Sequence, residues 1–275
     1  MISFPNAKIN LGLHVIEQMP NGYHTIDTVF YPVGWCDALE IVYTVELRSI
    51  PFSMEIRGAD FSDELKSNLC YKDYQLLSYQ FQLPTMNCFL QKGIPSGAGL
   101  GGGSSDAAST LDLINKLEDL QLTSAQLMEY ASFLGSDCSF FINSKPVRAG
   151  GTGTVFFPVQ LSLEGYYIVI VMPPFTMSTS EAYRSIKPSK PDIPLESLML
   201  LPVSHWKHVL TNDFEELVFN KYPVLKSIKE KLYINNAVYA SMSGSGTAMY
   251  GIFEKETDLK NIFRDCKVWS GKALY

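Results

Sequence analysis

The sequence predicts a globular α/β (α+β) fold that consists of one large domain or two modest ones. The chain has 275 residues, whereas a single domain commonly has roughly 100 to 200. With 46% hydrophobic and 18% charged residues, its composition is typical of a globular protein and excludes a disordered or fibrous one. Strand-like alternation and helix-like spacing of apolar residues both occur along the chain, which indicates the mixed fold.

Strand patterns dominate the early chain. Apolar and polar residues alternate over residues 7–14 and again over 39–47, as in strands with one buried face. Residues 54–57 are predicted to form the hairpin partner of the second strand. Residues 87–91 predict a further strand directly before a glycine-rich loop.

Helix patterns follow these strands. Ser62 is predicted to lead into a helix, and a second helix is predicted from the apolar spacing over 111–120. Thr123 and Gln126 form a capping-box pattern that predicts the start of a third helix, with Gly135 as its C-terminal cap. The second half is predicted to contain strands at 166–171, 237–241 and 248–253, helices at 179–185 and 213–219, and an exposed loop at 187–196.

Charge and cysteine usage limit the possible partners. The formal net charge of -6 comes from 28 acidic and 22 basic residues, so nucleic acid is a poor partner. The five cysteines contain no C-x-x-C pair, which favours a reducing cytoplasm over a disulfide framework or a zinc site. The apolar run at 166–172 is far shorter than the roughly 20 residues of a membrane span, and the start lacks a secretory signal pattern. We therefore expect a cytoplasmic protein without nucleic-acid or membrane partners.

The stretch from Pro95 to Ala108 carries the strongest chemical signal. Five glycines fall within the seven residues 97–103, between a predicted strand and a predicted helix. Such a loop lets backbone amides approach a ligand closely, and the helix N-terminus adds a positive dipole end, so the stretch suits phosphate. The alternative is a flexible linker or a tight packing turn.

The loop does not match the commonest nucleotide motifs. A Walker A loop needs a lysine at its end, and none occurs between Lys92 and Lys116. The G-x-G-x-x-G pattern is present, but the acidic residues Glu118 and Asp119 lie in or just after a helical run rather than at the end of a second strand. The H-R-D and D-F-G tripeptides of protein kinases are absent from the sequence.

Three ordered motifs resemble those of the GHMP kinases. They are the glycine loop, Asn6-Ala7-Lys8-Ile9-Asn10-Leu11 and Ser243-Gly244-Ser245-Gly246-Thr247. Within this superfamily, three more segments resemble the kinases of 4-diphosphocytidyl-2-C-methyl-D-erythritol: 21–25, 134–137 and 212–215. The resemblance covers nearly the whole chain.

This resemblance implies a fold and a reaction. The fold would have two domains, at residues 1–157 and 158–275, the first similar to ribosomal protein S5 domain 2, with the active site in the cleft between them. ATP would phosphorylate the 2-hydroxyl of the cytidyl substrate, giving the 2-phosphate and ADP in the methylerythritol phosphate pathway of isoprenoid biosynthesis. Mg²⁺ is expected as well, carried mainly by the ATP phosphates. The partners would then be small molecules, ATP and the cytidyl substrate, and we expect a monomer or weak homodimer.

The resemblance also implies roles for individual residues. Lys8 and Asp137 take the positions of the catalytic lysine and aspartate. The ATP-binding positions are Asn68, Lys92, Pro95, Ser96, Gly97, Ala98, Gly99, Leu100, Gly101, Gly102, Gly103, Ser104 and Ser105. The substrate-binding positions are Asn10, Tyr23, His24, Thr179 and Tyr183, and those that close the site are Ser243, Gly244, Ser245 and Gly246.

The residues by themselves leave alternatives open. Asp137 could be a helix N-cap, Lys8 a solvated lysine, and residues 21–24 and 243–247 ordinary turns. Another GHMP kinase, of the homoserine or mevalonate type, is an alternative enzyme. A dinucleotide-dependent oxidoreductase and a non-catalytic nucleotide sensor are alternatives from other functional classes.

Overall fold

A computed structural model describes residues 1–44, 50–58 and 65–275. Its contacts divide the chain into two compact units. Unit 1 consists of Met1–Ala7, Trp35–Ser96 and Gly101–Ser144, and unit 2 of Lys8–Gly34, Gly97–Leu100 and Lys145–Tyr275. The chain therefore passes between the units several times, and the boundary after residue 157 stays a prediction.

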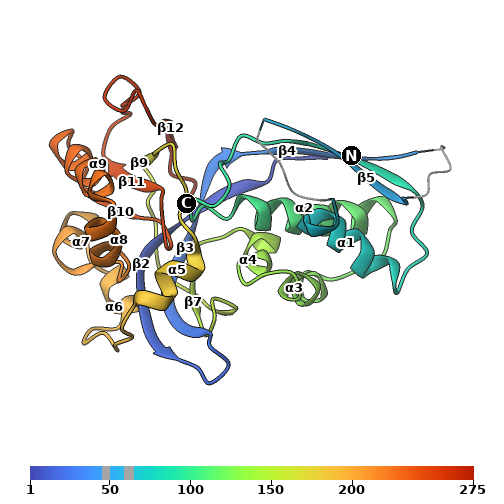
Figure 1. Ribbon diagram of the computed structural model, residues 1–275, viewed down its shortest axis with the longest axis horizontal. Helices are drawn as coiled ribbons and strands as arrows, with labels where there is room; N and C mark the ends of the chain where they lie inside the picture. Colours follow the sequence, from blue (N-terminus) through green and yellow to red (C-terminus); the bar gives the residue numbers. More distant parts are fainter. Residues whose placement is uncertain (45–49, 59–64) are drawn as a thin grey trace. The chain divides into compact units, whose positions relative to one another are not determined.

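Unit 1 contains a four-stranded sheet with helices along one of its faces (Figure 1). The strand order is β1 (Ile2–Ser3), β4 (Ala38–Tyr43), β6 (Met86–Gln91) and β5 (Phe52–Arg57). The helices are the 3-10 turn η1 (Leu65–Ser67), α1 (Leu69–Ser78), α2 (Gly102–Leu117), α3 (Ser124–Ser132) and α4 (Cys138–Asn143). Inward residues of the strands, such as Leu39 and Leu90, share one buried cluster with Leu77, Leu111 and Ile114 of the helices. This apolar layer holds α2, and hence the end of the glycine loop, against the sheet.

The prediction that residues 54–57 form a hairpin with the strand at 39–47 is wrong. β6 pairs with β4 in antiparallel register and with β5 in parallel register, so β5 is separated from β4 by a whole strand. Alternation reports which side chains of a strand are buried, and it does not report which edge the strand joins. The last part of the predicted strand 39–47, residues 45–47, lies outside the described residues.

The capping signals predicted the start of α3 (Ser124–Ser132) correctly but not its end. The capping box of Thr123 and Gln126 is present at the start of α3, as predicted. Helix α3 ends at Ser132 with Phe133 as its C-cap, so the prediction of Gly135 as the cap is wrong. Helix α1 begins after Asn68, whose side chain accepts a hydrogen bond from the Cys70 amide, whereas the predicted start at Ser62 lies outside the described residues.

Unit 2 contains two four-stranded sheets and five helices. The first sheet has the order β2 (Asn6–Gln18), β3 (His24–Cys36), β7 (Val147–Gly150) and β8 (Val155–Phe157), with the first residues of β2 and the last of β3 belonging to unit 1. The second has the order β10 (Tyr239–Met242), β11 (Met249–Phe253), β9 (Tyr167–Met172) and β12 (Lys267–Lys272). The helices are α5 (Thr179–Ser185), α6 (Leu195–Met199), α7 (Val203–Val209), α8 (Glu215–Lys221) and α9 (Pro223–Ile234).

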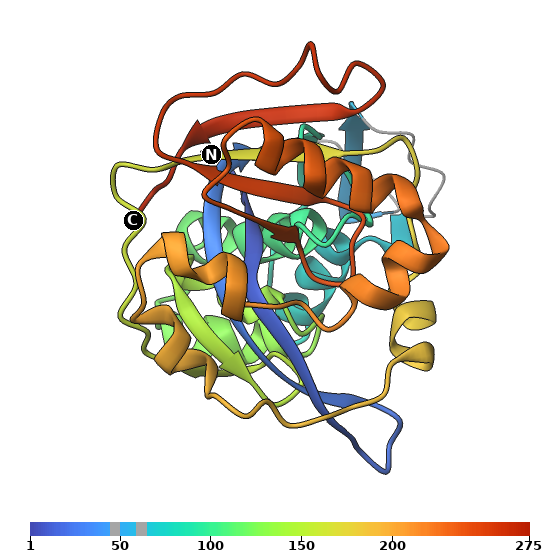
Figure 2. The same ribbon diagram turned by 90° about the vertical axis from the view of Figure 1, so that its left-hand side faces the viewer.

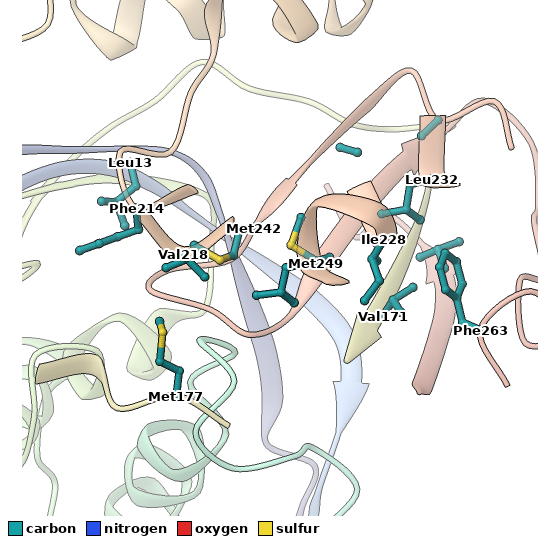
Figure 3. Packing of buried hydrophobic residues seen from close by; sticks show 14 of the residues in the cluster. Leu13, Val171, Met177, Phe214, Val218, Ile228, Leu232, Met242, Met249 and Phe263 are labelled. Atoms are coloured by element: carbon teal, nitrogen blue, oxygen red, sulfur yellow. The ribbon is translucent and has the colours of Figure 1, made fainter. Parts of the chain in front are cut away.

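Helix α9 covers β10 and β11 in the second sheet (Figure 2). Its residues Ile228 and Leu232 point toward Val171 and Met249 of the strands, with Phe263 beside them (Figure 3). The strands predicted at 166–171, 237–241 and 248–253 correspond to β9, β10 and β11. The hairpin between β10 and β11 carries the predicted site-closing residues at its tip.

Within the part of the chain that the structure describes, no helix combines the length and the apolar character needed to cross a membrane.

Candidate active site

The glycine loop joins β6 to α2 and has an alternating backbone. Gly97, Gly99 and Gly101 have φ angles of 68°, 78° and 73°, and the residues between them, Ala98 and Leu100, are not in the left-handed region. Glycines with positive φ allow successive backbone amides to approach an anion closely. Gly101 is also the N-cap residue of α2. The loop therefore combines a glycine-rich backbone with a helix N-terminus, which is a combination that suits phosphate.

Three successive carbonyl oxygens of this loop accept hydrogen bonds within unit 2. The donors are the Ala248 amide to Ala98 O at 3.1 Å, the Ser243 hydroxyl to Gly99 O at 2.9 Å and the Lys8 amide to Leu100 O at 2.9 Å. Each bond fixes the orientation of one peptide group. Residues 97–100 are thereby held in place by β2 and by the tip of the β10–β11 hairpin, and do not form a free linker.

Lys8 is buried and not solvated. It is 3% exposed, its ammonium donates to Asn10 Oδ1 at 2.7 Å, and Nζ lies 4.9 Å from the centre of the Phe30 ring. Asn10 in turn donates from Nδ2 to the Thr28 hydroxyl at 3.0 Å. The two residues lie on the same side of β2, as their spacing of two predicts. The alternative of a solvated lysine is excluded by this burial.

The tip of the β10–β11 hairpin contacts Asn10 and the glycine loop. The Ser243 hydroxyl accepts a hydrogen bond from the backbone amide of Asn10 at 3.3 Å. A Cβ atom at Gly244 would lie 3.3 Å from Asn10 Oδ1 and 3.5 Å from the Cα atom of Gly99. Ser245 donates to the Thr179 hydroxyl at 3.1 Å. The structure thus brings together the predicted substrate residues Asn10 and Thr179, the predicted ATP-phosphate loop and the predicted site-closing residues.

Two predicted substrate residues form an aromatic cluster. The rings of His24 and Tyr183 lie 5.1 Å apart, and Tyr183 packs edge-on against Phe214 at 4.9 Å. Tyr23 is 62% exposed, although it is a large aromatic residue. Gly22, with a φ of 85°, forms the turn that places Tyr23 and His24 at the start of β3. The turn alternative for 21–24 is therefore correct as structure, and the turn carries an exposed aromatic ring.

Two residues of the segment 212–215 form hydrogen bonds with the tip of the β10–β11 hairpin and the end of β10. Asn212 donates from Nδ2 to the carbonyl oxygens of Met242 and Gly244 at 2.9 and 2.8 Å. Glu215 accepts hydrogen bonds from the Met242 amide at 2.9 Å and the Ser241 hydroxyl at 3.0 Å. The sequence marked this segment only through the family resemblance. Its role as a support was missed because the partners are about thirty positions away along the chain.

Asp213, in the same segment, forms its contacts with β2 and not with the β10–β11 hairpin. Its carboxylate accepts the Val15 amide at 2.8 Å and lies 3.2 Å from Nδ1 of His14. Both contacts lie at β2, beyond Asn10. The segment 212–215 therefore ties β2 and the β10–β11 hairpin together, which fixes the surroundings of Asn10 from two sides.

In unit 1, Lys92 forms a buried ion-pair group. Its ammonium donates to Asp37 and, at 2.6 Å, to Asp106. Burial lowers the pKa of Lys92, but the two carboxylates outweigh this effect and the pKa is raised overall. Burial raises the pKa of Asp106 above its usual range, although Lys92 opposes the rise. Asp37 and Asp106 were both missed, because nothing local in the sequence shows that they meet a lysine.

Asn68 caps α1 with its side chain, which accepts the Cys70 amide at 2.9 Å. Asp137 occupies the N-cap position of α4, as the structural alternative predicts, yet its side chain makes no capping hydrogen bond. The next residue, Cys138, is buried, and burial raises the pKa of its thiol to about 12.

The predicted site residues thus fall into two groups. Unit 2 holds Lys8, Asn10, Tyr23, His24, residues 97–100, Thr179, Tyr183 and residues 243–246, and unit 1 holds Asn68, Lys92, Pro95, Ser96, Asp137 and residues 101–105. Within the described ranges 1–44, 50–58 and 65–275, no group of three or more histidine, cysteine, aspartate or glutamate residues could hold a metal ion.

Comparison with known proteins places these features in a family. The GHMP kinases N terminal domain matches residues 68–145, and the GHMP kinases C terminal domain matches residues 201–268. A curated protein from Bacteroides fragilis named 4-diphosphocytidyl-2-C-methyl-D-erythritol kinase is 50% identical over 256 residues, which cover 93% of each chain. The chain belongs to the GHMP kinase family. A relative of the same name from Parabacteroides distasonis is 45% identical over 99% of each chain.

Solved structures agree with the assignment to the GHMP kinases. The crystal structure of a 4-(cytidine 5'-diphospho)-2C-methyl-D-erythritol kinase matches with a TM-score of 0.83 and 29% identity over 98% of each chain. The mevalonate kinase of Methanococcus jannaschii matches with a TM-score of 0.72 and 14% identity, over 100% of this chain and 98% of that one, and shares the fold. The predicted fold family and kinase class are confirmed by these matches.

Proposed function

We propose that this GHMP kinase transfers the γ-phosphoryl group of ATP to the 2-hydroxyl of 4-diphosphocytidyl-2-C-methyl-D-erythritol. The relatives that match over nearly the whole chain bear the name of this kinase. The observation in the structure that carries the proposal is a series of hydrogen bonds from Lys8 to Asn10, from Asn10 to Ser243 and from Ser243 to the glycine loop. The Lys8 amide also donates to the loop, at Leu100 O. This arrangement places a buried cation beside a glycine-rich loop of the kind that suits phosphate.

Phosphoryl transfer asks mainly for positioning and for stabilisation of charge. The oxygen of the 2-hydroxyl forms a bond to the γ-phosphorus while the bond from that phosphorus to the oxygen bridging to the β-phosphate breaks, and ADP leaves. The loop 95–105 would bind the phosphates through its amides and the α2 N-terminus. Lys8, which is fixed by Asn10, would offset the negative charge that spreads over the phosphoryl oxygens.

Asp137 is proposed to accept the proton of the 2-hydroxyl. An alcohol becomes a nucleophile as its proton moves to a nearby base, and a carboxylate can accept that proton. Asp137 stands at the position of the family's catalytic aspartate, at the N-cap of α4, and this match supports the role. Mg²⁺ would neutralise phosphate charge and be carried mainly by the ATP phosphates, since this ion commonly uses only one or two protein carboxylates beside them.

The cytidyl group is proposed to bind beside Tyr23, His24 and Tyr183. An exposed tyrosine ring offers a face on which a pyrimidine can stack, and a histidine can form a hydrogen bond with the edge of the base. Thr179 and Asn10 would contact the remainder of this substrate. The site-closing role of residues 243–246 is supported by their contacts with Asn10, Thr179 and Gly99.

ADP release with MgATP tests the reaction against a panel of acceptors: the cytidyl substrate, mevalonate, homoserine and galactose. We expect turnover with the cytidyl substrate alone, and a loss of orders of magnitude in Asp137→Asn with ATP binding retained. Turnover with another alcohol would contradict the proposed substrate. ATP binding without any turnover would favour a nucleotide sensor.

Tyr23→Ala tests the base-binding surface. Removing the exposed ring should raise KM for the cytidyl substrate while KM for ATP and the melting temperature stay unchanged. Tyr79→Ala is the matched control, because Tyr79 is 86% exposed and belongs to no proposed binding group. Equal kinetics of the two variants would remove Tyr23 from the binding site.

A further inference from the structure

Two buried carboxylates share the ammonium group of Lys92. The side chains of Lys92, Asp37 and Asp106 are 2%, 0% and 4% exposed. A buried ion pair loses much of its attraction to the cost of desolvation, so stability alone is a weak reason to keep three such groups. Their place in the chain points to another role.

Asp37 fixes the entrance of the phosphate loop. Its Oδ1 atom accepts the amides of Gly93 and Ile94 at 2.6 and 2.7 Å, the two residues that follow Lys92. The sheet register explains the meeting, because Ala38 pairs with Gln91 and the next position of this antiparallel ladder sets Asp37 opposite Lys92. One carboxylate therefore holds both the lysine and the backbone that leads into the loop.

Asp106 fixes the exit of the loop. It directly follows Ser104 and Ser105 in α2, and its Oδ2 atom accepts the Lys92 ammonium at 2.6 Å. Gly102, one helical turn earlier, packs against the same place. A Cβ atom there would lie 2.9 Å from Ile94 Cγ2 and 3.4 Å from Lys92 Nζ. The two ends of the loop thus converge on one ammonium group.

We propose that Asp37, Lys92 and Asp106 are positioning residues that hold the two ends of the phosphate loop at the separation that ATP requires. This inference rests on the proposed function. A segment with five glycines has large conformational freedom, and a ligand must compensate for the entropy lost when such a segment is ordered. The ion-pair group orders the ends of the loop before ATP arrives. Lys92 then acts on ATP through the loop, with its ammonium bound to the two carboxylates.

Asp106→Asn tests this role, because it removes the charge and keeps the shape. The matched control is Asp112→Asn on the same helix, where an exposed aspartate pairs with Lys116 at 2.5 Å. MgATP affinity is measured by calorimetry without acceptor, and KM is measured for both substrates. Asp106→Asn should weaken MgATP binding and raise KM for ATP by about tenfold or more, since small misplacements of binding groups have large effects. KM for the cytidyl substrate and all constants of Asp112→Asn should stay unchanged.

A merely structural role predicts a different pattern. Loss of folded protein lowers the apparent kcat and leaves the dissociation constant of the remaining folded enzyme unchanged. If Asp106→Asn does not fold, the triple variant Asp37→Asn, Lys92→Met and Asp106→Asn replaces it, because neutral groups of similar volume leave no uncompensated buried charge. Unchanged MgATP affinity in a folded variant would overturn the positioning role alone. Failure of the unaltered protein to bind MgATP would overturn the proposed function and this inference with it.

Discussion

Gly99→Ala is the substitution for which the structure gives the clearest physical consequence. Gly99 lies in the phosphate loop with a φ of 78°, a conformation that residues with a Cβ atom rarely adopt. A Cβ atom there would lie 2.1 Å from the carbonyl oxygen of Ser243 and 3.4 Å from that of Gly246. Both neighbours are backbone atoms, so no side-chain rotation relieves the clash. The loop or the hairpin tip must move.

The expected cost follows from these two effects. The left-handed conformation costs a non-glycine residue roughly 1 to 2 kcal/mol. Overpacking a well-packed region costs about 1 to 3 kcal/mol more. The total of about 2 to 5 kcal/mol corresponds to a fall in the melting temperature of about 4 to 20 °C, since each kcal/mol shifts a domain of about 150 to 250 residues by about 2 to 4 °C. ATP affinity should fall as well, because the displaced loop presents its amides less well.

Gly103→Ala is the matched control in the same loop. A Cβ atom at Gly103 would meet nothing within 4 Å, and the residue lies in the first turn of α2. Alanine is favoured over glycine in a helix by about 0.5 to 1 kcal/mol, so this variant should melt at the same or a higher temperature. Thermal unfolding followed by circular dichroism compares the two. Equal melting temperatures for Gly99→Ala and the unaltered protein would refute the packing of the loop against Ser243.

Three further predictions concern stability and reactivity. Asn212→Ala removes both hydrogen bonds to the hairpin tip and leaves buried carbonyl oxygens unsatisfied. Urea unfolding should show a free energy of unfolding that is lower by about 1 to 3 kcal/mol, and an unchanged midpoint would refute the supporting role. Burial raises the thiol pKa of Cys138 to about 12. At pH 8 this thiol should therefore stay unmodified by iodoacetamide in the native protein and react once the protein is unfolded in urea. Modification in the native state would contradict the burial. Burial raises the pKa of Asp106, so this carboxyl keeps its proton in the folded state at pH values where the unfolded carboxyl, which titrates near pH 4, has lost it. The contribution of Asp106 to the free energy of unfolding should therefore fall as the pH rises from about 4 toward neutrality. Urea unfolding as a function of pH should show this decline, and Asp106→Asn should lack it; identical pH profiles would exclude Asp106 as its source.

Local signals in the sequence predicted local structure. The capping box at Thr123 and the glycine loop before α2 were found because the interacting residues are neighbours in the chain. The alternation over 7–14 predicted β2 and placed Lys8 and Asn10 on one side of it. These features depend on only a few consecutive residues, so the sequence is sufficient for them.

Features that depend on long-range contacts were not predicted. The partner of β5 was wrong because the insertion of β6 is decided by sheet pairing, which alternation does not report. The bond between Ser243 and Asn10 spans 233 positions, and the ion pair of Lys92 with Asp37 spans 55. Such contacts arise only when the strands have assembled, so the residue types by themselves could not reveal them. Only the family resemblance connected the three motifs in advance.

Phosphorus NMR of the reaction with MgATP and 4-diphosphocytidyl-2-C-methyl-D-erythritol tests the proposed reaction most directly. The γ-phosphate signal of ATP should disappear while a phosphomonoester signal appears on the cytidyl product, with its diphosphate bridge intact and with no reaction in Asp137→Asn. Formation of ADP and inorganic phosphate without a phosphomonoester, or unchanged ATP, would contradict the assignment of this chain as a kinase of that substrate.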